Sequence, residues 1–145
     1  MKVITLSKTF PKYHPRAGEQ TGFADAFLSG RKIHTIRANE KGYYQDGDIV
    51  SVRQWSGNPY ASKQETLKDG IGISVLPVII RFDNVSLSIR VRPYLGASFS
   101  FVDPSVVADN DGLSLSDFIA WFNPKRMPNL VLNYSMIHFT DFRYE

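Results

Sequence analysis

The sequence predicts an α+β fold in which strands outnumber helices. Residues 85–92 alternate apolar and polar side chains, which is typical of a strand with one buried face. Residues 23–28 and 114–122 carry apolar side chains at helical spacing, and a strand pattern at 131–139 follows the second of them. These observations indicate a strand-rich chain with two short helices.

Length and composition restrict the number of domains and the classes of site that the protein can contain. The 145 residues are expected to form a single domain, 1–145, because they can bury a core without crosslinks and contain no linker. The absence of cysteine excludes a disulfide framework, a thiolate zinc site and a cysteine nucleophile. A net charge of +3 is compatible with a polyanionic partner. No apolar run is long enough to cross a membrane and no signal-peptide pattern follows the N-terminus, so we expect a cytoplasmic protein without a membrane partner.

The first elements are a strand, a loop and a helix. Residues 3–7 alternate as a strand does, whereas residues 10–22 lose all periodicity and contain prolines and glycines. Thr21 can cap the helix that follows. Gly30 is expected to end that helix, because a residue without Cβ adopts the left-handed conformation at low cost. The β-branched stretch 33–37 then favours a strand.

Residues 30–37, Gly-Arg-Lys-Ile-His-Thr-Ile-Arg, gather three cations and a hydroxyl at this helix-to-strand corner. Across a corner, Lys32 and Thr35 can converge on one pocket, whereas on a straight strand they would point to opposite faces. If Lys32 is buried near Arg31 and Arg37, it loses its proton more readily and could act as a base toward the Thr35 hydroxyl. Alternatively, the cations stay charged and hold phosphate, or they are ordinary solvated charges at a helix C-terminus.

This run resembles the G-x-K-x-x-T-x-R signature of the ASCH family, a branch of the PUA-like β-barrel superfamily. The preceding helix, the Gly47-Asp48 turn before a strand, and the late helix followed by a last strand are similar too. The resemblance covers residues 21–55 and about 106–142, and the stretch at about 56–100 looks like an insertion. It implies a PUA-like (ASCH) β-barrel with two short helices and an inserted β-hairpin.

Some small bacterial proteins with this fold are acetylcytidine amidohydrolases, which use the lysine and threonine of the run and a glutamate just before the late helix. The resemblance therefore implies catalytic roles for Lys32, Thr35 and Asp111, which stands where the glutamate would be. Aspartate is one methylene shorter than glutamate. Asp109 could take its place.

Two aromatic pairs are candidates for stacking on a nucleobase. Tyr43 and Tyr44 lie in a loop after the run, and Trp55 and Tyr60 flank a turn with Lys63 beyond it as a phosphate contact. The alternatives are that the two tyrosines belong to the core and that Trp55 and Tyr60 only pin the loop.

The remaining elements follow in order. Strands are expected at 49–55, 71–82 and 85–91, with the last two forming a hairpin, and residues 93–112 are expected to be irregular. Ser114 is the expected N-cap of the second helix, with Asp117 as its capping-box partner. Residues 131–139 are expected to form the closing strand.

The resulting functional prediction is a nucleic-acid or nucleotide-binding ASCH domain, and its expected ligand is RNA, a nucleotide or a nucleoside. The residues expected to bind it are Arg31, Lys32, Arg37, Tyr43, Tyr44, Trp55, Tyr60 and Lys63. The alternative is an amidohydrolase that acts on an acylated nucleoside. No cofactor is implied, and the three histidines have no metal-ligand spacing.

Overall fold

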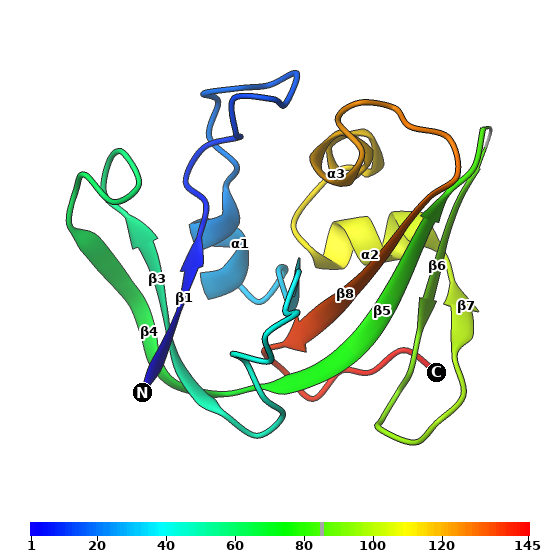
Figure 1. Ribbon diagram of the computed structural model, residues 1–145. Coiled ribbons are helices and arrows are strands. Elements are labelled where there is room, and N and C mark those ends of the chain that lie inside the picture. Colours follow the sequence, from blue (N-terminus) through cyan, green and yellow to red (C-terminus); the bar gives the residue numbers. More distant parts are fainter. Residues whose placement is uncertain (85) are drawn as a thin grey trace.

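The computed structural model describes residues 1–84 and 86–145, and its strands form two sheets rather than a closed barrel (Figure 1). The α+β class predicted from the sequence is confirmed, whereas the expectation of a closed barrel is not met. One sheet has three strands in the order β1-β3-β4, and the other has five in the order β2-β8-β5-β6-β7.

The three-stranded sheet contains β1 (Lys2–Leu6), β3 (Ile49–Trp55) and β4 (Gln64–Gly72). Strand β3 lies between the other two, parallel to β1 and antiparallel to β4. Most of β4 was not predicted from the sequence, because this edge strand is exposed along most of its length and so lacks the apolar alternation of a half-buried strand. A single residue, Ile73, separates β4 from β5, so the chain passes directly from one sheet into the other (Figure 1).

The five-stranded sheet is built from elements distant in sequence. It contains β2 (His34–Arg37), β5 (Ser74–Phe82), β6 (Leu87–Val91), β7 (Ser100–Val102) and β8 (Leu130–His138). The predicted hairpin is confirmed as the antiparallel pair β5 and β6, while Val85 lies outside the described residues. Strand β5 is the middle strand of this sheet, so the stretch expected to be an insertion contributes to the main core.

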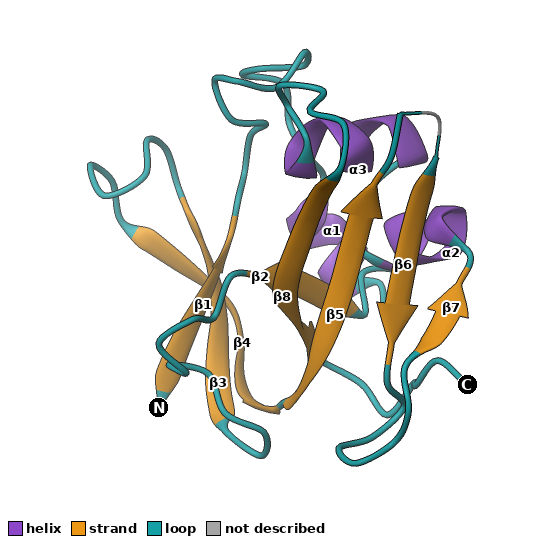
Figure 2. Cartoon of the chain, turned by 45° about the vertical axis from the view of Figure 1, so that its right-hand side comes forward, coloured by secondary structure: helices purple, strands orange, loops and turns teal. Residues whose placement is uncertain are grey.

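The described residues contain three helices, α1 (Phe23–Leu28), α2 (Pro104–Asn110) and α3 (Leu115–Phe122), and all lie behind the five-stranded sheet in Figure 2. The prediction of two helices was therefore wrong, because residues 93–112 were expected to be irregular and contain both β7 and α2. Helix α2 buries only Val107 and Ala108, so it leaves no helical period in the sequence.

One of the N-terminal helix-capping predictions is confirmed and the others are not. Ser114 is the N-cap of α3, and its hydroxyl accepts from the Asp117 amide. The Asp117 carboxylate binds Arg16 and does not act as the expected capping-box partner. At α1 the N-cap is Gly22, and the Thr21 hydroxyl accepts from the Phe23 amide at 3.2 Å.

One cluster of buried apolar side chains runs through both sheets and the helices that pack on them. Within residues 1–84 and 86–145, no helix combines the length and the apolar character that crossing a bilayer would demand.

Candidate functional site

The helix-to-strand corner is held by backbone hydrogen bonds on both sides. Gly30 has φ of 83°, and its amide donates to the Phe27 carbonyl while the next amide donates to the Ala26 carbonyl at 2.8 Å. This pattern is a Schellman motif, which uses the left-handed residue to satisfy the last carbonyls of a helix. Beyond it, the Ile33 amide donates to the carbonyl of Asn110 at the end of α2. The corner is thus fixed between α1 and α2, which directs Lys32 inward.

Lys32 is a buried cation, 2 % exposed. Its Nζ donates to the Asp111 carbonyl oxygen at 2.7 Å, lies 3.4 Å from Asp111 Oδ1, and sits 4.3 Å from the centroid of the Phe23 ring. Burial lowers the pKa of Lys32, and Arg37 lowers it further, while the Asp111 carboxylate opposes both effects. A lysine in these surroundings can lose its proton more readily than an exposed one.

A cavity of about 600 Å³ opens beside this pair, between the two sheets and the loop that precedes α1. The sequence-predicted residues that line it are Lys32, Thr35, Arg37, Trp55, Tyr60 and Asp111. The Trp55 and Tyr60 rings lie 5.1 Å apart at 49° and form one side of the cavity. Side chains predicted to act together therefore do share one concave surface.

Two oxygen atoms at the base of the cavity have no protein partner among the described residues. The Thr35 hydroxyl makes no hydrogen bond there, and neither does Asp111 Oδ2. Neither atom is sealed from solvent, although Thr35 is only 7 % exposed and Asp111 4 %. Both groups are therefore available to a molecule in the cavity.

Arg37 joins the two sheets at the cavity wall. Its Nη2 donates to the carbonyl oxygen of Thr5 on β1. Burial lowers the pKa of Arg37, with Tyr44, Asp111 and Tyr60 opposing the shift. Arg37 thus contributes a hydrogen bond between the two sheets and also lines the cavity.

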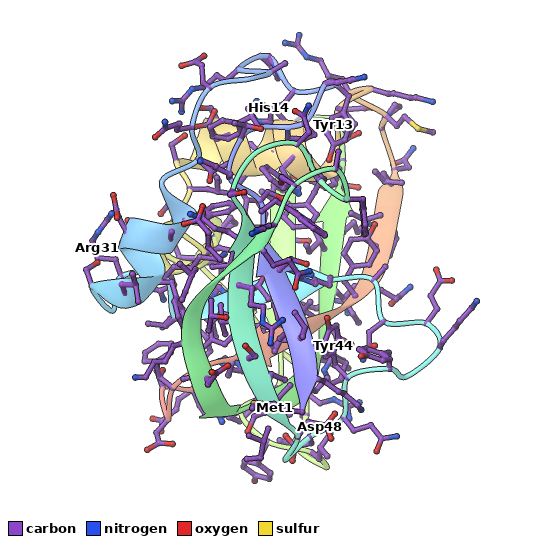
Figure 3. All side chains as sticks on the ribbon, turned by 90° about the vertical axis from the view of Figure 1, so that its left-hand side faces the viewer. Met1, Tyr13, His14, Arg31, Tyr44 and Asp48 are labelled. Carbon is purple, nitrogen blue, oxygen red and sulfur yellow. The ribbon has the colours of Figure 1, made fainter. Side chains whose placement is uncertain are left out.

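The other predicted residues lie away from the cavity, and they are Arg31, Tyr43, Tyr44, Lys63 and Asp109. Arg31 is exposed at the outer edge of α1 (Figure 3). The Tyr44 hydroxyl donates to the Val3 carbonyl at 2.8 Å, and Tyr43 packs edge-on against Tyr44. These two side chains support the edge of β1 and do not face the proposed ligand. Asp109 lies on the exposed face of α2, so Asp111 is the acid at the cavity.

Several residues that line the cavity were not predicted from the sequence. Lys8 and Lys12 come from the loop before α1, and Trp121 comes from α3. The charged residues that line the cavity are therefore Lys8, Lys12, Lys32 and Arg37 against Asp111. This balance favours an anionic ligand. The two lysines were weakly indicated by the sequence, because they belong to a basic loop that precedes residues 30–37. Nothing in the sequence indicated Trp121.

His34 was also missed as a site residue. Its Nδ1 lies 3.0 Å from Asp111 Oδ1, and its Nε2 lies 2.7 Å from the hydroxyl of Tyr144. Its position in the run was a signal, but its partners are 77 and 110 residues away in the chain.

Within the described residues, no three His, Asp or Glu side chains are arranged to hold a metal ion. Comparison of the chain with protein-family models, with curated proteins and with solved structures gives no match.

Proposed function

We propose that the cavity binds a nucleotide unit of RNA, or a free nucleotide or nucleoside, and that the chain is a PUA-like domain of the ASCH type. The observation that carries the proposal is the shared cavity, which combines cations with stacked aromatic rings. Its volume of about 600 Å³ lies within the range of about 300–1,000 Å³ that small-molecule sites occupy. The resemblance of residues 30–37 to the G-x-K-x-x-T-x-R signature supports the same assignment.

Each part of a nucleotide has a chemical counterpart in the wall. The Trp55 and Tyr60 rings offer a face on which a base can stack, as single-stranded RNA readers do. Lys8 and Lys12 supply the positive charge that a phosphate needs. Thr35 and Asp111 at the base of the cavity offer hydrogen bonds to polar groups of the ligand.

Tryptophan fluorescence provides the test, because both tryptophans of the protein line the cavity. Titration with a short single-stranded RNA should change the emission, and the affinity should fall as salt is added. Lys12→Ala should weaken binding and reduce the salt dependence by about one phosphate contact. Lys63→Ala is the matched control, since Lys63 is exposed outside the cavity. Equal effects of the two substitutions would argue against this site.

The second candidate is amide hydrolysis, and the state of Lys32 favours it. Burial lowers the pKa of Lys32, which favours loss of its proton, and the Lys32 and Thr35 side chains line the same cavity. In this reaction the Lys32 amine takes the Thr35 proton as the oxygen attacks the acyl carbon. The amide C–N bond then breaks, the proton passes to the leaving amine, and water hydrolyses the acyl-threonine ester.

Incubation with N4-acetylcytidine separates the two candidates. A hydrolase should release cytidine and acetate, Thr35→Ala should abolish the release, and Thr35→Ser should retain it because the hydroxyl remains. No turnover above the buffer rate would remove the hydrolase candidate for this substrate and leave the binding function standing.

A further inference from the structure

Four polar side chains form a continuous series of hydrogen bonds, and of the four only Asp111 lines the cavity. Asn110 Nδ2 donates to the Tyr144 hydroxyl at 3.0 Å, and that hydroxyl lies 2.7 Å from His34 Nε2. His34 Nδ1 in turn lies 3.0 Å from Asp111 Oδ1. His34 is completely buried and Tyr144 is 7 % exposed, so solvent does not compete for the two hydrogen bonds of the imidazole.

The donors and acceptors available fix which group donates in each of these hydrogen bonds. An ionised carboxylate only accepts, so His34 Nδ1 carries the proton that is donated to Asp111. Tyr144 already accepts from Asn110, so its own proton is free to be donated to His34 Nε2. The neutral Nδ1–H tautomer of His34 therefore satisfies every member. A doubly protonated imidazole would leave the buried Tyr144 proton without an acceptor, which is costly.

The two carboxylate oxygens of Asp111 have different surroundings. Oδ1 accepts from His34 at 3.0 Å and lies farther, at 3.4 Å, from Lys32 Nζ, whose shorter bond goes to the Asp111 carbonyl. Oδ2 makes no hydrogen bond with the described residues, is not sealed from solvent, and belongs to a side chain that lines the cavity. A carboxylate held by Lys32 alone could rotate toward the ammonium, so the imidazole is what fixes the direction of Oδ2.

We propose that His34 is a positioning residue, held by Tyr144 and Asn110, that fixes the Asp111 carboxylate with Oδ2 directed at the ligand as a hydrogen-bond acceptor. The inference rests on the proposed nucleoside site. Its consequence is selectivity, because an acceptor in this place favours a base with an N–H donor over one with a carbonyl oxygen. Cytidine and uridine are a suitable pair of probes, since they differ at ring position 4 by an amino donor and a carbonyl acceptor.

Isomeric amides at position 34 provide the test. The amide nitrogen of Asn stands near the place of the imidazole Nδ1, so His34→Asn should keep the donor to Asp111. The amide nitrogen of Gln stands near Nε2, so His34→Gln should lose it. We expect the wild-type protein to bind cytidine about tenfold or more better than uridine. The preference should persist in His34→Asn and collapse in His34→Gln.

Tyr144→Phe removes the hydroxyl and keeps the ring, and it should reduce the preference as well. Tyr134→Phe is the control, because Tyr134 lies on β8 and makes no hydrogen bond in this chain of groups. Nitrogen-15 NMR of labelled histidine reads the tautomer without any ligand and should report a proton on Nδ1 of His34. A proton on Nε2 instead would overturn the proposal.

The outcomes separate the two claims. If the wild-type protein binds neither nucleoside, the nucleoside site on which the inference rests fails and the inference falls with it, while the RNA titration tests the remaining part of the proposed function. If it binds both and the Asn and Gln variants show the same preference, only the positioning role of His34 is wrong.

Discussion

Arg16 Nη1 lies 2.5 Å from Asp117 Oδ2, and this ion pair joins the loop before α1 to helix α3. His14 adds a second link, because its Nε2 lies 3.1 Å from the Asp117 carbonyl oxygen. The same loop carries Phe10 and Lys12 into the cavity wall (Figure 3 shows His14 above α3). One wall of the candidate site therefore depends on contacts with a helix that is about a hundred residues away in the sequence.

Asp117→Asn should loosen this wall without removing any residue that faces the ligand. We expect the affinity for single-stranded RNA to fall by roughly two- to fivefold, the effect of losing one surface ion pair. Trypsin should cleave faster after Lys12, since the loop opens more often. Arg81→Gln is the control, because it breaks the exposed Arg81–Asp83 pair and leaves the loop intact. Unchanged cleavage in Asp117→Asn would show that the ion pair does not hold the loop.

Gly112→Ala should disturb Lys32 directly. Gly112 has φ of 83°, and an added Cβ would lie 3.3 Å from Phe23 Cδ1 and 3.5 Å from both Cβ and Cδ of Lys32. The left-handed backbone alone should cost about 1–2 kcal/mol of unfolding free energy. Gly96→Ala is matched in backbone, with φ of 91°, but nothing lies within 4 Å of its added Cβ.

Urea unfolding and RNA titration of the two alanine variants separate strain from displacement. Both variants should lose stability through the backbone, Gly112→Ala at least as much as Gly96→Ala, but only Gly112→Ala should lose ligand affinity. If Gly96→Ala lost affinity to the same extent, the effect would come from general destabilisation and not from Lys32.

Local chemistry made part of this site predictable. A glycine after an apolar helix and a β-branched stretch beyond it predict the corner, and the corner places Lys32 and Thr35 on one cavity. Trp55 and Tyr60 were also predictable as a pair, because a short turn brings its two ends together. In each case the partners are close in sequence.

The rest depends on contacts that sequence spacing does not encode. Tyr144 reaches His34 across 110 residues, and Trp121 enters the wall from a helix packed by distant contacts. Tyr44, a candidate for stacking, lies outside the cavity lining, and its hydroxyl donates to the Val3 carbonyl 41 residues away in the chain. Strand β4 was missed because exposure along an edge strand removes the apolar period.

Arg37→Lys should destabilise the fold more than a conservative change usually does. Arg37 donates to the Thr5 carbonyl and so connects β2 with β1 across the two sheets. The lysine ammonium cannot reproduce this planar donor, and the carbonyl would lose its partner in a partly buried place. We expect a loss of about 1–3 kcal/mol in the free energy of unfolding. Arg31→Lys should change it by less than about 0.5 kcal/mol, because Arg31 is exposed. Equal stability of the two variants in urea would contradict this role.

His138 should make the folded state sensitive to mild acid. Burial, together with the nearby His34 and Arg143, lowers the pKa of His138 from its ordinary value of 6.5 to about 3. Below pH 6.5, His138 therefore takes up a proton in the unfolded chain but not in the folded one. As a result, the free energy of unfolding decreases as the pH is lowered, until the pH approaches 3. At pH 5 the expected loss is about 2 kcal/mol relative to pH 7.

His138→Phe isolates this contribution, because it keeps a ring in the site and removes the titrating group. The free energy of unfolding should be measured in urea at pH 7 and at pH 5 for both proteins. The fixed cost of the substitution cancels in the difference between the two pH values, and so do the contributions of titrating groups that do not contact His138. The variant should lose about 2 kcal/mol less than the wild-type protein between these pH values. Identical losses in the two proteins would mean that His138 takes up its proton in the folded state as easily as in the unfolded chain.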